Sequence, residues 1–126
     1  MAPKDGVTNP EVSVVIPLRD EEQNVIPLYD ELTGVLAQMA VTYEMILVDD
    51  GSADRTFQKL AELQSLDAKV RAIRFTRNFG QTAAFAAGFA LARGRFIVTL
   101  DGDLQNDPRD IPAMLRGFYG DPVNTD

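Results

Sequence analysis

Two carboxylates that flank one glycine, Asp101 and Asp103, are the residues of this sequence best suited to chemistry. They follow an apolar run that is typical of a buried strand, and the glycine lets the backbone turn tightly toward a ligand. Hard oxygen ligands in this arrangement suit Mg²⁺ or Mn²⁺ bridged to a diphosphate. A polar turn that ends the strand is the alternative interpretation, because Asp and Gly are common turn residues.

A second acidic pair, Asp49 and Asp50, precedes Gly51. Either carboxylate could accept hydrogen bonds from a nucleobase N–H or from ribose hydroxyls, as the acidic residue after the second strand does in dinucleotide-binding folds. Alternatively, one of the two opens a turn through Gly51 and caps the next helix. We expect each residue to take one of these roles.

The polar segment from Arg77 to Gln81 offers a further group of functional side chains. Arg77 could contact a phosphate, and Asn78 could adopt a left-handed turn. A structural cap on the following helix is an equal alternative. The remaining arginines that we considered are expected to be solvated surface charges: Arg71, Arg74, Arg93, Arg95 and Arg116.

Composition removes several classes of function. The chain has 12 basic and 19 acidic residues, a formal net charge of -7, which disfavours nucleic acid as a partner because such proteins usually carry a basic stripe. It has no cysteine and no histidine, so disulfides, thiolate nucleophiles and Ser-His-Asp triads are excluded. Neither a Gly-x-Gly-x-x-Gly motif nor a P-loop motif is present, which disfavours NAD and P-loop ATP binding. No apolar stretch is long enough for a membrane span.

The elements that must position these residues follow from hydrophobic periodicity. Four apolar, largely β-branched runs predict strands, over 12–16, 45–48, 70–75 and 95–100, the first of them stopped by Pro17. Between them, apolar spacings of three and four predict a helix from Asn24 to about Met39 and another that Ser52 or Asp54 caps. An Ala-rich helix over 81–92 suits close packing on a sheet, and Pro108 marks the first turn of a further helix.

This order predicts an α/β fold with a mostly parallel sheet and helices on both faces. In such sheets, ligands bind beyond the carboxyl ends of the strands. The acidic residues that follow the first, second and fourth strands would therefore converge there. We expect a flexible leader over 1–10, one domain over 11–120 and a tail over 121–126.

Four stretches resemble family 2 glycosyltransferases of the GT-A fold, which is Rossmann-like, and in particular the polyprenyl-phosphate sugar transferases similar to dolichyl-phosphate mannose synthase. They are VSVVIPLRDEEQNV, ILVDDGSADRT, RNFGQTAAFAAGFALARG and VTLDGDLQNDP. These stretches keep the family's order and approximate spacing from Val12 to about Met114. The resemblance implies a nucleotide-sugar-binding domain.

The resemblance also implies roles for individual residues. Pro17, Arg19 and Glu21 would lie against the nucleobase and ribose, and Asp50 would hydrogen-bond the base. Asp101 and Asp103 would form the DXD motif that holds the divalent metal and the diphosphate, with Gln105 as a further metal ligand. The family usually has an aromatic-Asn-Glu run where this chain has Arg19, Asp20 and Glu21, and this difference bears on nucleotide preference.

The resemblance finally implies an activity, which is transfer of a hexose from a UDP- or GDP-linked sugar to a polyprenyl phosphate, with inversion and with Mg²⁺ or Mn²⁺. The catalytic carboxylate, the acceptor region and the membrane-associating helices would lie beyond the end of a truncated domain. A cytoplasmic location is expected, and the cytoplasmic face of a membrane for a longer parent. An exposed sheet edge could pair two copies.

Three alternatives stay open. The chain could be a nucleotide-binding module without turnover, or a family 2 transferase with a saccharide acceptor. A response-regulator-like switch also gathers aspartates at strand ends. That class requires a lysine at a late strand end, which this sequence lacks.

Overall fold

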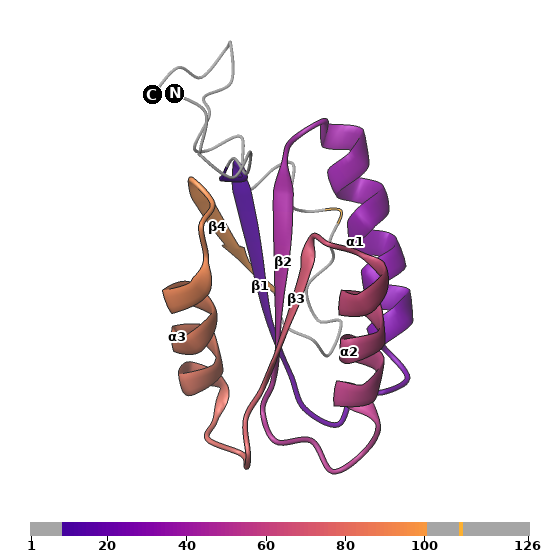
Figure 1. Ribbon diagram of the computed structural model, residues 1–126, viewed down its shortest axis with the longest axis vertical. Coiled ribbons are helices and arrows are strands. Elements are labelled where there is room, and N and C mark those ends of the chain that lie inside the picture. The colour runs from indigo at the N-terminus through magenta and orange to yellow at the C-terminus, as the bar shows by residue number, and fades with distance from the viewer. Residues whose placement is uncertain (1–8, 101–108, 110–126) are drawn as a thin grey trace.

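The computed structural model describes residues 9–100 and Arg109, and strands alternate with helices along this part of the chain (Figure 1). The elements are β1 (Val12–Leu18), α1 (Val25–Met39), β2 (Tyr43–Asp49), α2 (Thr56–Leu66), β3 (Val70–Arg74), α3 (Gln81–Leu91) and β4 (Phe96–Thr99). This is the predicted order. The further helix expected near Pro108 lies outside the described residues.

The four strands form one parallel sheet in the order β3-β2-β1-β4. Helices α1 and α2 cover one face and α3 covers the other (Figure 1). A parallel connection needs a crossover, and each crossover here contains a helix. The predicted parallel sheet with helices on both faces is therefore confirmed for the described residues.

Strand β1 is buried along its whole length because both of its faces are covered. Val14 and Ile16 pack into the cluster beneath α1 and α2, whereas Val15 packs with Ile46 and Ala84 beneath α3. This two-sided burial is the reason why the segment is almost continuously apolar. Ala84 is fully buried, as expected for an Ala-rich helix that lies close to a sheet.

The expected end of the first strand at Pro17 was wrong, because β1 continues to Leu18 and Pro17 pairs with Val48. The Val15 carbonyl accepts from Leu100 N and the Leu18 carbonyl accepts from Asp50 N, so alternation places the backbone of Pro17 on the β4 side. Strand β4 has already ended there, at Thr99. The missing N–H of Pro17 therefore removes no ladder bond from β4, and proline is tolerated.

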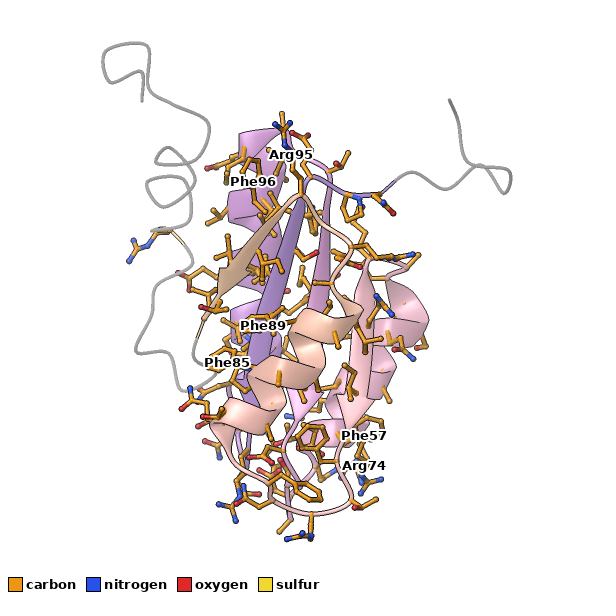
Figure 2. The ribbon with its side chains drawn as sticks, turned by 90° about the vertical axis from the view of Figure 1, so that its left-hand side faces the viewer. Phe57, Arg74, Phe85, Phe89, Arg95 and Phe96 are labelled. Carbon is orange, nitrogen blue, oxygen red and sulfur yellow. The ribbon has the colours of Figure 1, made fainter. Side chains whose placement is uncertain are left out.

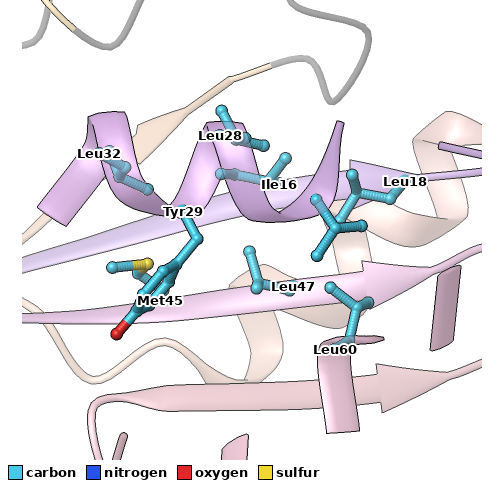
Figure 3. Close-up of a pocket in the computed structure, with 9 residues that line it drawn as sticks. Ile16, Leu18, Leu28, Tyr29, Leu32, Met45, Leu47 and Leu60 are labelled. Atoms are coloured by element: carbon cyan, nitrogen blue, oxygen red, sulfur yellow. The ribbon is translucent and has the colours of Figure 1, made fainter. Parts of the chain in front are cut away.

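Helix α1 packs on the sheet through an apolar stripe that includes Leu28 and Leu32. The close-up in Figure 3 shows these side chains over Ile16 and Met45 of the strands. They line a void of about 10 Å³, which is at most the size of one water and is entirely apolar, so it is a packing defect of the core. At its rim, the Tyr29 hydroxyl donates a 2.6 Å hydrogen bond to Asp67, which follows α2.

A buried carboxylate, Glu44, lies at the amino end of β2 and is 3% exposed. It forms ion pairs of 3.4 Å with both Arg71 and Arg93. The expectation that these two arginines are solvated surface charges was therefore wrong for Arg71, which is half-buried, whereas Arg93 is exposed as expected and pairs with Glu44 as well. The reason is physical: a buried carboxylate requires a charged partner, and the partners come from elements distant in sequence.

Two further arginines that were expected at the surface lie beside aromatic rings. Arg74 lies 5.0 Å from the centre of the Phe57 ring, and Arg95 lies 5.3 Å from that of Phe96 (Figure 2). Both guanidinium groups belong to exposed residues, as expected. Arg116 lies outside the described residues.

Candidate active site at the carboxyl edge of the sheet

The carboxyl ends of the strands meet at one edge of the sheet, the lower edge in Figure 1. Strands β1 and β2 are neighbours there, with Leu18 opposite Asp49 in the ladder. Arg19 and Asp50, which are the next residues of the two strands, therefore follow a paired position. The register thus brings two predicted nucleotide-binding residues to adjacent strand ends.

The loops that follow β1 and β2 are joined by several hydrogen bonds. Asp20 N donates to Ser52 Oγ at 2.9 Å, and Asp20 Oδ1 accepts from Ala53 N at 2.8 Å. This reciprocal pair holds Asp20 in a left-handed conformation with φ 52°, which aspartate tolerates better than most residues. The Glu21 N–H donates to Thr56 Oγ1 at 2.9 Å. The two loops consequently form one surface.

Asp54 fixes the start of α2. It accepts from Thr56 N at 2.9 Å, and the Thr56 hydroxyl and the Glu22 N–H also donate to it. Burial alone would raise the pKa of Asp54, but these hydrogen bonds outweigh burial and hold the pKa below its ordinary value. Of the two expected caps, Asp54 accepts a hydrogen bond from the first residue of α2, whereas Ser52 accepts one from Asp20 in the loop after β1.

The two aspartates at the end of β2, Asp49 and Asp50, have different hydrogen-bond partners. Asp49 Oδ1 accepts from Ser52 N at 3.1 Å, which is the expected turn bond, and Oδ2 is buried with no hydrogen-bond partner among the described residues. The Asp50 carboxylate, only 5% exposed at the residue level, instead faces the segment after β3. The turn role therefore belongs to Asp49, and the ligand role of Asp50 stays a prediction.

Asp50 holds the segment after β3 against the end of β2. Its Oδ1 accepts from Phe79 N at 2.8 Å, and its Oδ2 accepts from Gly80 N at 3.1 Å and from the Asn78 side-chain amide at 2.8 Å. Hydrogen bonds to a carboxylate are roughly twice as strong as neutral ones. The left-handed turn expected of Asn78 was wrong, since the described residues with positive φ are Asp20, Ala40, Gly51 and Gly80, and Asn78 uses its amide as a donor.

Gly51 permits this close approach of the two segments. A Cβ at this position would overlap the backbone of Arg77 and Asn78, and the residue has φ 72°, which side chains other than hydrogen disfavour. The glycine is thus needed for space as well as for conformation.

An arginine and an aromatic ring stand exposed above this junction. The Arg77 guanidinium lies 4.1 Å from the centre of the Phe79 ring, and the Phe75 ring meets Phe79 edge-on with centroids 5.6 Å apart. Arg77 and Phe79 are both exposed, so neither is needed to fill the core. They form a cationic, aromatic rim beside Asp50.

The other sequence-predicted site residues fall at this same edge. Pro17 is buried within β1, Arg19 is exposed directly after it, and Glu21 is half-buried and accepts a hydrogen bond from the Asn24 amide. Asp101, Asp103 and Gln105 lie outside the described residues. Leu100, the residue before Asp101, is buried and bonded through its N–H to Val15 of β1.

Two features of the edge escaped sequence reasoning. The bonds from Asp50 to residues 78–80 join positions about thirty apart, and the ties between Asp20 and Ser52 cross two loops. The signal that was available is the polar, glycine-containing composition of all three segments.

Among residues 9–100 and Arg109, no group of three or more Asp and Glu residues could hold a metal ion. No helix in this part is long and apolar enough to cross a membrane.

Comparison with known proteins gives three results. The model of the family described as glycosyl transferase family 2 matches residues 13–125. A dodecaprenyl-phosphate galacturonate synthase of Rhizobium johnstonii is 46% identical over 112 residues, which are 88% of this chain and 33% of that protein. An undecaprenyl-phosphate 4-deoxy-4-formamido-L-arabinose transferase of Pseudomonas fluorescens is 44% identical over 106 residues, 83% of this chain and 31% of that protein. The chain thus spans about a third of the length of these relatives.

Solved structures give the same fold. A mannosyltransferase from Pyrobaculum calidifontis in complex with GDP-Man and Mn²⁺ matches 91% of this chain and 34% of its own, with a TM-score of 0.66 and 22% identity. Glucosyl-3-phosphoglycerate synthase from Mycobacterium tuberculosis in complex with UDP matches 90% of this chain and 41% of its own, with a TM-score of 0.67 and 22% identity. The expected GT-A fold is confirmed as a partial domain.

Proposed function

Since the chain belongs to glycosyl transferase family 2, we propose that it is the nucleotide-sugar-binding part of an inverting, metal-assisted transferase that moves a hexose from a nucleotide diphosphate sugar to a polyprenyl phosphate. The polyprenyl-phosphate acceptor is inferred from the names of the two relatives that are 46% and 44% identical. The observation that carries the proposal is the carboxyl edge, where the segments after β1, β2 and β3 are bonded into one surface.

Within the proposal, the nucleobase and ribose lie over the ends of β1 and β2. Arg19 is exposed there and can stack on a planar base through its guanidinium. Asp50 and Glu21 are the acceptors for base N–H and ribose hydroxyl groups. Pro17 fixes the backbone beneath them. The Arg77 guanidinium, at the same edge, is available to a phosphate.

The proposed metal ligands are Asp101, Asp103 and Gln105. Two carboxylates and an amide oxygen are the hard donor set that Mg²⁺ and Mn²⁺ prefer, and β4 ends at Thr99, two residues before Asp101 in the sequence. A divalent cation bound there would stabilise the negative charge of the departing diphosphate.

The transfer reaction does not require a strong general base from the protein. An oxygen of the acceptor phosphate, already anionic, attacks the anomeric carbon from the face opposite the nucleotide. The bond from that carbon to the diphosphate oxygen breaks, its electron pair leaves with the nucleoside diphosphate, and the configuration inverts. A chain with no histidine can therefore serve this reaction.

The location follows from the substrates. Nucleotide sugars are soluble and the proposed acceptor is a membrane lipid, so we infer a cytoplasmic domain that works at the cytoplasmic face of a membrane. Support comes from the polyprenyl-phosphate names of the two relatives.

Calorimetric titration with UDP, GDP and their sugar conjugates, with and without Mn²⁺, tests the proposal. The chain should bind one nucleotide series more tightly with Mn²⁺, and Asp103→Ala should lose the metal-dependent part. Glu62→Ala, on the exposed face of α2, is the charge-matched control and should bind as the wild type does. Absence of nucleotide binding to the wild-type chain would refute the proposed site.

A second assay separates the remaining alternatives. A full-length protein is incubated with the preferred sugar nucleotide and with either polyprenyl phosphate or an oligosaccharide as acceptor. The reaction with polyprenyl phosphate should yield a glycosylated lipid phosphate, and the reaction with the oligosaccharide should yield no product. Transfer to the oligosaccharide alone would favour a saccharide acceptor. Nucleotide binding without transfer to either would identify a binding module.

A further inference from the structure

Glu44 is an unusual residue for its place in the sheet. It lies in β2 on the face covered by α3, where the next residues with the same orientation are Ile46 and Val48. Burial alone would raise the pKa of Glu44, but hydrogen bonds from Ser13 and from the Arg93 backbone, together with the charge of Arg93, hold it below its ordinary value. Glu44 is therefore a buried anion at neutral pH, and a buried anion is retained only where its partners are well placed.

The shortest bonds of Glu44 lead to β1 and to the turn between α3 and β4. Its Oε2 accepts from Arg93 N at 2.7 Å and from Ser13 Oγ at 2.6 Å. The same Ser13 hydroxyl oxygen accepts from Gly94 N at 2.8 Å. The Arg93 N–H is thus bonded to Glu44 of β2, and the Gly94 N–H is bonded to Ser13 of β1.

Steric fit and charge reinforce the attachment of the turn at Arg93 and Gly94 to β1 and β2. A Cβ on Gly94 would lie 2.6 Å from Ser13 N, so the turn is pressed against β1. Arg71 of β3 approaches Glu44 at 3.4 Å and also donates to the Leu91 carbonyl, the last residue of α3, at 2.8 Å. The end of α3 and the start of β4 are consequently held at one point.

Strand β4 is short and begins two residues after Gly94. It has only four residues, and within the described residues β1 is its single neighbour, with Val12 opposite Phe96 and Val15 opposite Thr99. A slip of one residue would move its carboxyl end by about 3.3 Å and turn every side chain to the other face. Metal ligands tolerate displacements of only about 0.5 Å.

We propose that Glu44, with Ser13, is a positioning residue that sets the register of β4, the strand that precedes Asp101 and Asp103 in the sequence, and thereby the metal dependence of nucleotide binding. This inference rests on the proposed metal role of those two aspartates. Glu44 lies at the opposite edge of the sheet and touches neither nucleotide nor metal in this arrangement.

The test compares Ser13→Ala and Glu44→Gln with Ser65→Ala and Glu62→Gln, the same changes at exposed positions of α2. The readout is the ratio of the Kd for UDP or GDP without Mn²⁺ to the Kd with Mn²⁺, measured on the 126-residue chain. We expect Ser13→Ala and Glu44→Gln to lower this ratio by about tenfold or more, because a displaced strand misplaces the groups that follow it, with the metal-free Kd unchanged. The control variants should keep the wild-type ratio.

An unchanged ratio in both folded variants, or an equal loss with and without Mn²⁺, would show that Glu44 is only structural. Amide hydrogen exchange gives a second readout that needs no nucleotide. Exchange at Phe96 and Leu100, whose N–H groups donate to the Glu11 and Val15 carbonyls, should accelerate in the two variants while exchange in β2 and β3 stays slow. If the wild-type chain shows no metal-dependent binding, the proposed function fails, and the exchange result still decides whether Glu44 controls β4.

Discussion

Asp50 is a residue whose structural bonds bear directly on its proposed function. Its carboxylate accepts four hydrogen bonds from residues 78–80, so it holds the segment that carries Arg77 and Phe79. A nucleobase that bonds to Asp50 would share this carboxylate with the segment. Base binding and the placement of Arg77 are therefore coupled through one side chain.

Gly51→Ala tests this junction. The added methyl group would overlap the backbone of Arg77 and Asn78 and would occupy a left-handed conformation, which costs about 1–2 kcal/mol before any overlap is counted. We expect a lower free energy of unfolding in urea and weaker nucleotide binding. Gly34→Ala is the control, because nothing lies within 4 Å of its added Cβ on α1. A Gly51→Ala variant as stable as the wild type would contradict the described contact.

At the scale of elements, the sequence was sufficient to predict the order of the described strands and helices, but not the end of β1 or the bonds between elements. The period of Val25, Leu28 and Leu32 identifies α1 because one face of the helix must be apolar, whatever covers it. The roles of Arg71 and Arg93 could not be found in this way, because their partner Glu44 becomes their neighbour only after β2, β3 and α3 have assembled. The predicted end of the first strand at Pro17 was wrong for the same reason, since β1 can contain a proline at this position only because β4 has already ended beside it.

The contact between α1 and the end of α2 gives a prediction about pH. The Tyr29 hydroxyl donates to the Asp67 carboxylate, and this bond, with burial, raises the pKa of Tyr29 to about 12. Because the folded pKa exceeds the ordinary value of 10.0, the bond stabilises the fold fully below that pH and is lost as the pH rises through about 12. Tyr29→Phe should lower the free energy of unfolding by about 1 kcal/mol at neutral pH.

Urea unfolding of both proteins at increasing pH measures this effect, and the difference should shrink above pH 10. Absorbance titration should show a late tyrosine ionisation that Tyr29→Phe removes. In Asp67→Asn, which removes the charge of the acceptor, that ionisation should move to lower pH. A Tyr29 that titrates at the ordinary value in the wild type would disprove the bond.

At the scale of the whole molecule, the sheet has an apolar border beside β4. Ile97 is 40% exposed, and Phe89 of α3 is 45% exposed. The Phe89 ring stacks on that of Phe85, and both side chains are labelled in Figure 2. In the described residues, β4 pairs on one side only, with β1. Unpaired strand edges with apolar side chains favour association between copies.

We therefore predict that the 126-residue chain self-associates through β4. Light scattering coupled to size exclusion should show a molecular mass that rises with concentration above 13.8 kDa. Ile97→Lys should keep the chain monomeric, because a charge on an edge strand opposes pairing, whereas Leu66→Lys, at an exposed position of α2, should not. A strictly monomeric wild type at high concentration would exclude this edge as an interface.

The sheet order also bears on how the chain is made. Among the described strands β1 is synthesised first, and it takes a central place and pairs with β4, which follows it by about 80 residues. At ordinary rates of translation, roughly 4 to 16 s pass before that partner has been synthesised. During this interval an apolar strand has one open edge, so the nascent chain is a natural client for chaperones that shield such edges.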